Sequence, residues 1–332
     1  TIETKQKQDF TGSPLELLLQ ITKRVEKQTG TTWAFVARQF AFSTQTFSNR
    51  TVDIDGSDTS LLFDLNLKAA HDKTYDPASL VAGSIVEIII RSGVLVSASN
   101  TSNYALTNPN TWPSGVFVRL VIESGAVVSG RGGDGGSGII QADIVILATD
   151  GHDGGLGMLI EYPIEIDNQG GFIKGGAAGS GAGGSVLAFD QSLINYWFIG
   201  GGGGSGGWPF GLAGNGAKAL DTTSGIWTVR NGNNGNTATG NTNNVVTTVF
   251  GGLQGNGISL SNGMFLLAGD GGDTNSVFAT GQNGDISQVL NPQAGVLYYV
   301  FAPSQGGQRG DAIHGNSLIT WVNTGTIYGD II

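Results

Sequence analysis

The stretch that most constrains the fold is Tyr196–Gly207, YWFIGGGGGSGG, in which four bulky apolar residues run directly into a block of glycines. Glycine loses more backbone entropy than any other residue when it becomes ordered, and it brings no side chain to bury. A folded protein therefore uses glycine this densely where backbones lie almost in contact. From Gly125 onward the chain repeats the same contrast between apolar stretches and glycine.

Glycine and charge both divide the chain near residue 125. Of the 56 glycines, 6 precede Gly125 and 50 lie from that position onward. Residues 1–130 carry 11 Lys and Arg against 12 Asp and Glu, a net charge of −1, whereas residues 131–332 carry 5 against 14, a net charge of −9. An acidic, glycine-rich half repels phosphates, so we expect no nucleic-acid partner.

Composition excludes two further classes of structure. The chain has no cysteine, so disulfides and thiolate metal ligands are absent. No apolar run reaches the roughly 18 residues that a membrane-spanning helix needs, so we expect no membrane span. Neither an initiator Met nor a signal-peptide pattern is present at Thr1, which indicates that the numbering begins within a longer or processed chain.

A repeat runs through most of the chain: an apolar strand, a small turn ending in glycine, a second apolar stretch and a glycine-rich segment. The turn glycines are Gly93, Gly125, Gly170, Gly200, Gly232, Gly263, Gly295 and Gly325. Their successive spacings are 32, 45, 30, 32, 31, 32 and 30 residues. A period this constant predicts stacked supersecondary units that share one core. The spacing of 45 predicts an insertion of about 14 residues around Thr149–Tyr162.

We therefore predict a mostly β fold in which repeated β-hairpins, with a period of about 31 residues, alternate with packed polyglycine segments. Residues 84–97, SIVEIIIRSGVLVS, are expected to form one such hairpin around Arg91–Gly93. The glycine segments are expected to adopt the extended left-handed conformation with three residues per turn, whose backbone groups bond to neighbouring segments. Flexible glycine linkers are the alternative, which the regular spacing disfavours.

The start of the chain has a different character. A short helix is predicted over residues 14–28. Ser13 can cap its start, Pro14 suits the first helical position, and Glu16 can reach back to the cap. Its apolar residues occupy two faces, so it packs against copies of itself or against the chain's own sheet. We assign residues 1–83 to an N-terminal attachment and oligomerisation region, a helix followed by strands, and residues 84–332 to a glycine-rich repeat domain.

Motifs for catalysis or metal binding are weak. The nucleophile-elbow pattern at Gly203–Gly207 is nearly guaranteed inside a glycine tract. Glu161, Glu165 and Asp167 lie on or beside a strand and could pair as hydrolytic carboxylates. Pieces of a glycine-aspartate calcium repeat surround Asp134, Asp270 and Asp273, but such repeats need tandem nine-residue copies, so turns are favoured. We predict no catalytic residues, no metal and no cofactor.

Aromatic and amide side chains beside glycine are the best candidates for a binding surface. Aromatic residues offer large contact area at low entropy cost, and asparagine adapts its hydrogen bonds on loops held by a rigid scaffold. The alternative is that the aromatic residues simply cover the glycine layers. For Trp208 this alternative is favoured about equally with a binding role. The candidate contact residues are Trp208, Phe210, Trp227, Arg230, Asn233, Asn234 and Asn236.

Two segments resemble a known family. IEIDNQGGFIKGGAAGSG and the C-terminal residues 310–332, GDAIHGNSLITWVNTGTIYGDII, resemble parts of the glycine-rich receptor-binding proteins of bacteriophage tail tips and central tail fibres. The glycine blocks are also similar to those of the tip adhesins of T-even-like phages, whose fold packs polyglycine helices. The resemblance covers roughly residues 84–332.

This resemblance implies a non-enzymatic adhesin at the tail tip of the virion. It implies that exposed loops bind a bacterial outer-surface receptor, whether protein, pilus or glycan, and that the chain contacts other tail proteins and forms a homotrimer. The alternative function is a surface-polysaccharide depolymerase of a phage tail spike, which would use Glu161 or Glu165.

Overall fold

The computed structural model describes residues 49–138, 148–190, 195–218, 226–238, 253, 258–259, 264–273 and 281–332. All of these residues belong to one compact unit, Ser48–Ile332. The structure is mostly β, with 34% strand and 7% helix, and its α-helix in the described ranges is the short α3, Leu67–Thr74. The helix predicted over residues 14–28 lies outside the described residues.

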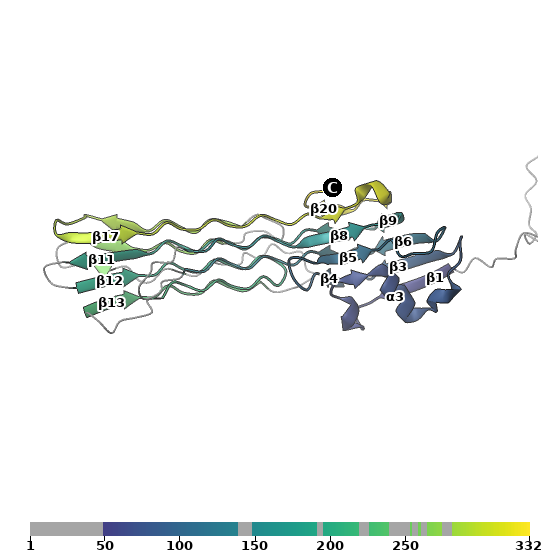
Figure 1. Ribbon diagram of the computed structural model, residues 1–332, viewed down its shortest axis with the longest axis horizontal. Helices are drawn as coiled ribbons and strands as arrows, with labels where there is room; N and C mark the ends of the chain where they lie inside the picture. Colours follow the sequence, from purple (N-terminus) through teal and green to yellow (C-terminus); the bar gives the residue numbers. More distant parts are fainter. Residues whose placement is uncertain are drawn as a thin grey trace, which may run out of the picture. The chain divides into compact units, whose positions relative to one another are not determined.

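Three parallel sheets form a body that contains the C-terminus (Figure 1). The first sheet has the order β1 (Asn49–Ile54), β3 (Ile85–Ile90), β6 (Phe117–Ile122), β9 (Ile164–Asn168) and β19 (Ile319–Asn323). The second has the order β4 (Leu95–Ser97), β7 (Val127–Ser129), β10 (Phe172–Lys174) and β20 (Thr326–Tyr328). The third has the order β2 (Leu65–Asn66), β5 (Tyr104–Asn108), β8 (Leu156–Ile160) and β18 (Ile313–His314).

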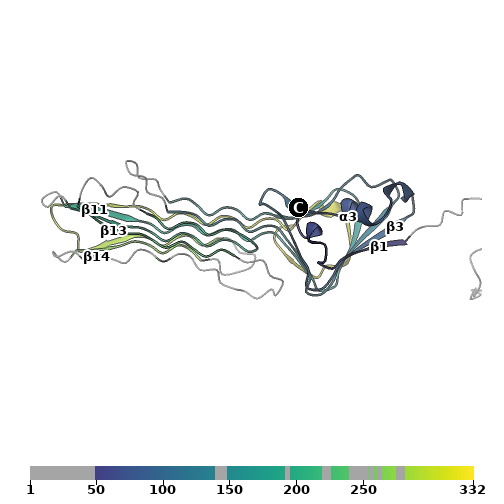
Figure 2. The same ribbon diagram turned by 90° about the horizontal axis from the view of Figure 1, so that it is seen from below.

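The chain visits the three sheets in turn, so the body is a parallel β-helix whose sheets meet at corners (Figure 2). Inward-facing side chains stack from turn to turn. Ile88 pairs with Leu120 and Leu120 with Ile166, and all three are fully buried. Burying each such side chain contributes roughly 1.5–3 kcal/mol, so this apolar ladder holds successive turns in register.

The predicted hairpin over residues 84–97 is wrong. β3 pairs in parallel with β1 and β6, while β4 pairs in parallel with β7, so the two apolar strands beside Gly93 lie in different sheets. The spacing has another meaning, because Ile85 pairs with Phe117, 32 residues later, which is one full turn of the β-helix. Gly93 and Gly125 stand at the same corner with φ of +80° and +82°, a conformation that glycine adopts without strain.

Two glycine-rich stretches leave the β-helix between its second and third sheets. Residues 130–155 connect β7 to β8, and residues 175–312 connect β10 to β18. The extra length predicted around Thr149–Tyr162 therefore lies between Ser129 and Leu156. β8 and β18 still pair side by side, with Met158 opposite Ile313, so the departures leave the β-helix intact.

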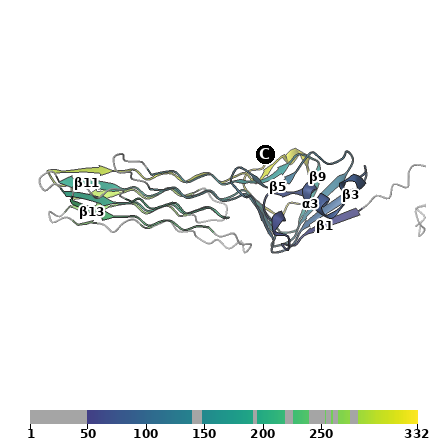
Figure 3. The ribbon, with the colours of Figure 1, turned by 60° about the horizontal axis from the view of Figure 1, so that its bottom comes forward.

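The glycine-rich segments run alongside one another as wavy traces (Figure 3). Their backbone hydrogen bonds repeat every three residues. The amides of Gly130, Gly133 and Gly136 donate to the carbonyls of Lys174, Ala177 and Ser180. Those of Gly132, Gly135 and Gly138 donate to Pro209, Leu212 and Asn215, and the carbonyls of Arg131, Asp134 and Ser137 accept from Gly155, His152 and Thr149. Successive residues of one segment thus face three different neighbours.

At the glycines where two of these segments meet, the spacing leaves no room for a side chain. A Cβ placed on Gly132 would lie 1.8 Å from the carbonyl oxygen of Gly207, and one placed on Gly179 would lie 2.0 Å from that of Asp134. Both distances are far inside van der Waals contact, so any larger residue forces the backbones apart.

Two small sheets lie where the glycine-rich segments end, away from the β-helix, and Figure 2 shows them as separate layers. The distal sheet has the order β13 (Ile226–Arg230), β12 (Asn195–Ile199), β11 (Val186–Asp190) and β17 (Val296–Val300). The other has the order β14 (Ile258–Ser259), β15 (Phe265–Leu267) and β16 (Gln288–Leu290). Their shared core is Val186, Ala188, Ile199, Met264, Leu266, Ala268 and Val296. Within the described ranges, no helix is long and apolar enough to cross a membrane.

Candidate binding surfaces

Strand β17 forms one edge of the distal sheet and exposes most of its side chains. Leu297, Tyr298, Tyr299 and Val300 are 48%, 42%, 59% and 46% exposed. Side chains alternate between the two faces of a strand, so Leu297 and Tyr299 share one face and Tyr298 and Val300 the other. Four large apolar side chains at this exposure, on a single strand, mark a surface suited to contact with another molecule.

The face that carries Leu297 and Tyr299 continues across the sheet. Phe189 pairs with Leu297 on one side and with Tyr196 on the other. The rings of Phe189 and Tyr196 stack with their centroids 4.3 Å apart. We call Phe189, Tyr196, Leu297 and Tyr299 the outer aromatic face; stacked rings of this kind are rigid and present their area with little entropy to lose.

The structure places part of the predicted site beside this face. In the parallel pairing of β12 with β13, Trp227 lies opposite Tyr196 and Arg230 opposite Ile199. Asn233, Asn234 and Asn236 follow β13 and are exposed. The side chain of Asn234 accepts a hydrogen bond from the Gly216 amide at 3.0 Å, so it also holds two glycine-rich segments together.

Trp208 and Phe210 lie elsewhere, against the β-helix. Trp208 is 2% exposed and packs with Val127 of the second sheet, and the ring centroid of Phe210 is 5.6 Å from that of Phe63. A side chain buried this deeply has no surface for a receptor. The prediction that Trp208 contacts the receptor is therefore replaced by its alternative, that the ring covers the glycine layers. The structure therefore does not bring the seven candidate residues into one site.

Under Trp208 lies a buried lysine that sequence reasoning missed. The Lys174 ammonium stands 4.9, 4.8 and 5.6 Å from the ring centroids of Phe172, Trp208 and Tyr328, and the residue is 0% exposed. Burial lowers the pKa of Lys174 to about 8 because the charged form loses its hydration. The one hint in the sequence is a charged residue at the end of the apolar stretch FIK, immediately before glycine.

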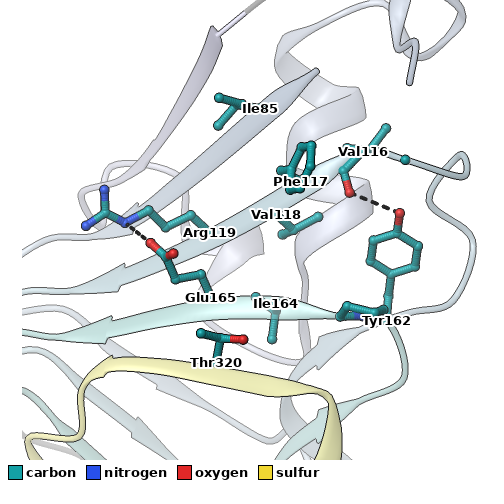
Figure 4. Close-up of a pocket in the computed structure, with 11 residues that line it drawn as sticks. Ile85, Val116, Phe117, Val118, Arg119, Tyr162, Ile164, Glu165 and Thr320 are labelled. Carbon is teal, nitrogen blue, oxygen red and sulfur yellow. Dashed lines mark hydrogen bonds and ion pairs between the residues drawn. The ribbon is translucent and has the colours of Figure 1, made fainter. Parts of the chain in front are cut away.

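A groove of about 560 Å³ opens on the outer side of the first sheet (Figure 4). Phe117, which is 66% exposed, lines it together with Ile85 and Tyr162. At its border Arg119 reaches Glu165 at 3.1 Å. The groove is therefore mainly apolar with a charged rim.

The acidic residues at this rim are tied to one guanidinium. Arg119 also contacts Glu87 at 3.4 Å and Asp167 at 2.9 Å. Hydrogen bonds from Asn323, from Gln169 and from Arg119 lower the pKa of Asp167 below its usual range. A glycosidase general acid needs a raised pKa, so the lowered pKa of Asp167 fits a structural ion network better than hydrolysis.

Of the aspartates considered as calcium ligands, Asp134 has a backbone amide as the partner of its side chain. Asp134 Oδ1 accepts a hydrogen bond from the Leu212 amide at 2.8 Å, and Asp150 and Asp153 accept in the same way from Gln305 and Gln308 at 2.7 and 2.6 Å. These carboxylates extend the three-residue hydrogen-bond pattern at its border. In the part of the chain that the structure describes, no group of three or more potential ligand residues gathers to hold a metal.

Comparisons with known proteins identify the family. The family model of the phage tail fibre adhesin Gp38 matches residues 49–332. No curated protein matches the chain. Among solved structures, it is similar to a chain of the gp37-gp38 adhesin tip complex of the bacteriophage S16 long tail fiber, with 21% identity, a TM-score of 0.42, and coverage of 94% of this chain and 98% of that chain. On the extent of the family match, the chain belongs to the Gp38 family of phage tail fibre adhesins.

Proposed function

We propose that this adhesin contacts its host receptor through the outer aromatic face of the distal sheet. As a tail fibre adhesin, the chain acts at the tail tip of the virion and binds a receptor on the bacterial surface. The exposure of Leu297 and Tyr299 beside the stacked rings of Phe189 and Tyr196 is the observation that carries this assignment. Binding energy concentrates on aromatic anchors of this kind.

Residues near this face are proposed as further contacts. Trp227 and Arg230 belong to β13, which pairs with β12. Asn233 and Asn236 follow β13 and are exposed. Exposed amides beside aromatic residues supply adaptable hydrogen bonds around an apolar centre.

We propose that the β-helix faces the rest of the tail. The groove beside Phe117 and Ile85 offers an apolar contact, and Glu165 lines it. These features suit a tail protein that presents apolar and basic side chains. Residues 1–83, which include the first turn of the β-helix, are proposed to contribute to the same attachment.

We propose that the glycine-rich segments are packed polyglycine helices that act as a stiff spacer. The three-residue repeat of their hydrogen bonds supports this, since a left-handed helix with three residues per turn presents each third residue to the same neighbour. The homotrimer implied by the resemblance stays a prediction; the native mass of the purified full-length chain tests it.

We propose a non-enzymatic role. The ion pairs of Glu165 and Asp167 with Arg119 support it, because both carboxylates are engaged in holding adjacent strands. Glu165→Gln is expected to leave host binding unchanged. Halos on bacterial lawns that disappear with this variant would establish the depolymerase alternative instead.

Binding of purified protein to permissive host cells, with free phage as competitor, tests the receptor surface. Leu297→Ala and Tyr299→Ala are each expected to weaken binding about tenfold or more, since truncating an anchor costs at least 1–2 kcal/mol. Val322→Ala is the matched control, because Val322 is 48% exposed but lies on β19 of the β-helix. Equal binding by all three variants would exclude the outer aromatic face as the contact surface.

A further inference from the structure

In the part of the chain that the structure describes, the outer edge of β17 has none of the protection that sheet edges normally have. Edge strands are usually blunted by charged side chains, proline, a bulge or a covering element, because their unpaired amides and carbonyls attract other strands. Val296–Val300, VLYYV, carries no charge and no proline, and its five pairs with β11 run without a bulge. β1, at the edge of the first sheet, instead carries Arg50 and Asp53.

The register of β17 with β11 shows which backbone groups of β17 point away from β11. The Phe301 amide donates to the Ser185 carbonyl at 2.9 Å, which continues the antiparallel register of β17 with β11. In such a ladder every second residue turns its amide and carbonyl toward the partner strand. The backbone amides and carbonyls of Leu297 and Tyr299 therefore point toward β11. Those of Tyr298 and Val300 point toward the outer edge of the sheet. Among the strands that the structure describes, β11 alone pairs with β17.

We propose that β17 binds the host receptor by strand addition: an extended segment of a receptor protein pairs with its outer edge. This rests on the proposed function and adds the class of receptor and the mode of contact. The added strand hydrogen-bonds to Tyr298 and Val300. Its side chains lie beside Leu297 and Tyr299 on one face and beside Tyr298 and Val300 on the other, so both exposed faces are covered at once.

Two observations favour a receptor protein over the other occupants. Amides and carbonyls that recur every second residue match an extended polypeptide, whereas a glycan has no such regular alternation. A second copy of this chain is disfavoured by charge, since each copy has a net charge of −10 and like-charged chains repel. The occupant is therefore an extended segment of a different protein.

Hydrogen exchange on the full-length wild-type chain tests the contact directly. The probe is outer-membrane vesicles from a permissive host, and vesicles from a host to which the phage does not adsorb are the control. The Tyr298 and Val300 amides are expected to exchange at least tenfold more slowly with the permissive vesicles only. Wild-type protein that binds the vesicles without this protection would overturn strand addition and leave the proposed function standing.

A backbone variant gives a second test. Tyr298→Pro removes one outward amide while sparing the amides that face β11, so the fold tolerates it at an edge. It is expected to weaken vesicle binding about tenfold, the value of one hydrogen bond, whereas Tyr298→Phe binds as wild type. Equal binding by Tyr298→Pro, with an unchanged Tm, would overturn the proposal. If that variant does not fold, the exchange measurement decides.

Two further outcomes separate the ideas. Wild-type protein that binds neither the permissive vesicles nor the host cells would overturn the proposed function itself, and strand addition with it. A concentration-dependent dimer in native mass spectra that Tyr298→Pro abolishes would show that the edge belongs to a second copy. Protection by purified host polysaccharide alone would also contradict a protein partner.

Discussion

At the scale of the single residue, Lys174 shows most clearly how local chemistry joins two parts of the fold. It is the last residue of β10, and the next residue begins a glycine-rich segment. Its ammonium lies among three aromatic rings, one of which, Trp208, comes from a different glycine-rich segment. Attraction of a cation to ring faces offsets part of the cost of burying the charge.

The pH dependence of stability follows from this burial. The pKa of Lys174 is about 8 in the folded chain against 10.5 for an ordinary lysine. Between these values the unfolded chain holds a proton that the folded chain has released, so stability rises as the pH goes from 8 to 10.5 and is independent of this group below pH 8. The full change is at most about 3 kcal/mol. Urea unfolding at pH 7.5 and at pH 10 measures it.

Lys174→Met is the matched control for this prediction, since it keeps the length of the side chain without a titratable group. As the pH rises, the unfolding free energy of wild type is expected to increase relative to that of this variant. A difference that stays constant from pH 7.5 to pH 10 would show that Lys174 does not titrate in this range. Comparing the two proteins cancels the titration of other groups.

Trp208→Ala distinguishes the packing role of this residue from a receptor contact. Removal of a large ring from a buried site between the β-helix and the glycine-rich segments is expected to lower the unfolding free energy by about 3–5 kcal/mol. Asn236→Ala, at an exposed position, is expected to change it by less than about 0.5 kcal/mol. Thermal unfolding of both variants provides the comparison, and equal Tm values would contradict the packing role.

At the scale of the element, the glycine-rich segments depend on backbone contact. Residues 130–138 face three neighbours through three successive residues, and glycines such as Gly132 and Gly179 meet a backbone at close range. Some small residues still fit: Ala177 and Ala178 are fully buried within the same segment. Stability of these segments is therefore a matter of position, and total glycine content alone does not describe it.

Gly179→Ala tests this positional requirement. Its Cβ would stand 2.0 Å from the Asp134 carbonyl oxygen, so the two segments must separate and lose hydrogen bonds. A loss of about 3 kcal/mol or more is expected in urea unfolding. Ala178→Gly, one residue away, is the control, with an expected cost of about 1 kcal/mol from backbone entropy and the missing methyl group. Similar effects of the two variants would show that the segments adjust freely.

At the scale of the whole molecule, separate surfaces are assigned to separate tasks. The groove beside Phe117 belongs to the β-helix, and the outer aromatic face belongs to the distal sheet. The two surfaces are carried by different sheets with different cores. Substitutions at one are therefore expected to leave the other intact.

Phage assembled with variant adhesin separates these tasks. Phe117→Asp places a charge in the apolar groove and is expected to reduce the amount of this chain in purified virions at least tenfold, by immunoblot, while the free protein still binds host cells. Tyr299→Ala is expected to enter virions normally and to slow adsorption. If Phe117→Asp virions carried the normal amount of adhesin, the groove would not be an attachment surface.

The particular residues show where sequence reasoning succeeds. Alternation in residues 84–97 predicted strands, and the spacing of Gly93 and Gly125 predicted a stacked unit, because both signals depend on local chemistry. The hairpin was wrong because a turn through a glycine with positive φ can reverse the chain or turn a corner between sheets, and the choice depends on distant partners. Lys174 was missed because Trp208 and Tyr328, which lie against it, are distant in the sequence. The groove beside Phe117 was missed because Ile85 and Tyr162, which also line it, come from other turns of the β-helix.

The sequence by itself determined that this chain is mostly β, that its glycines serve close backbone packing, and that it resembles phage adhesins. These properties depend on composition and short-range pattern, which each residue carries with it. Only the tertiary structure decided that the strands form a parallel β-helix, that Trp208 covers Lys174, and that β17 lies at the edge of its sheet among the described strands. Burial and strand order depend on which segments meet in space, and a single sequence does not encode those meetings in any local signal.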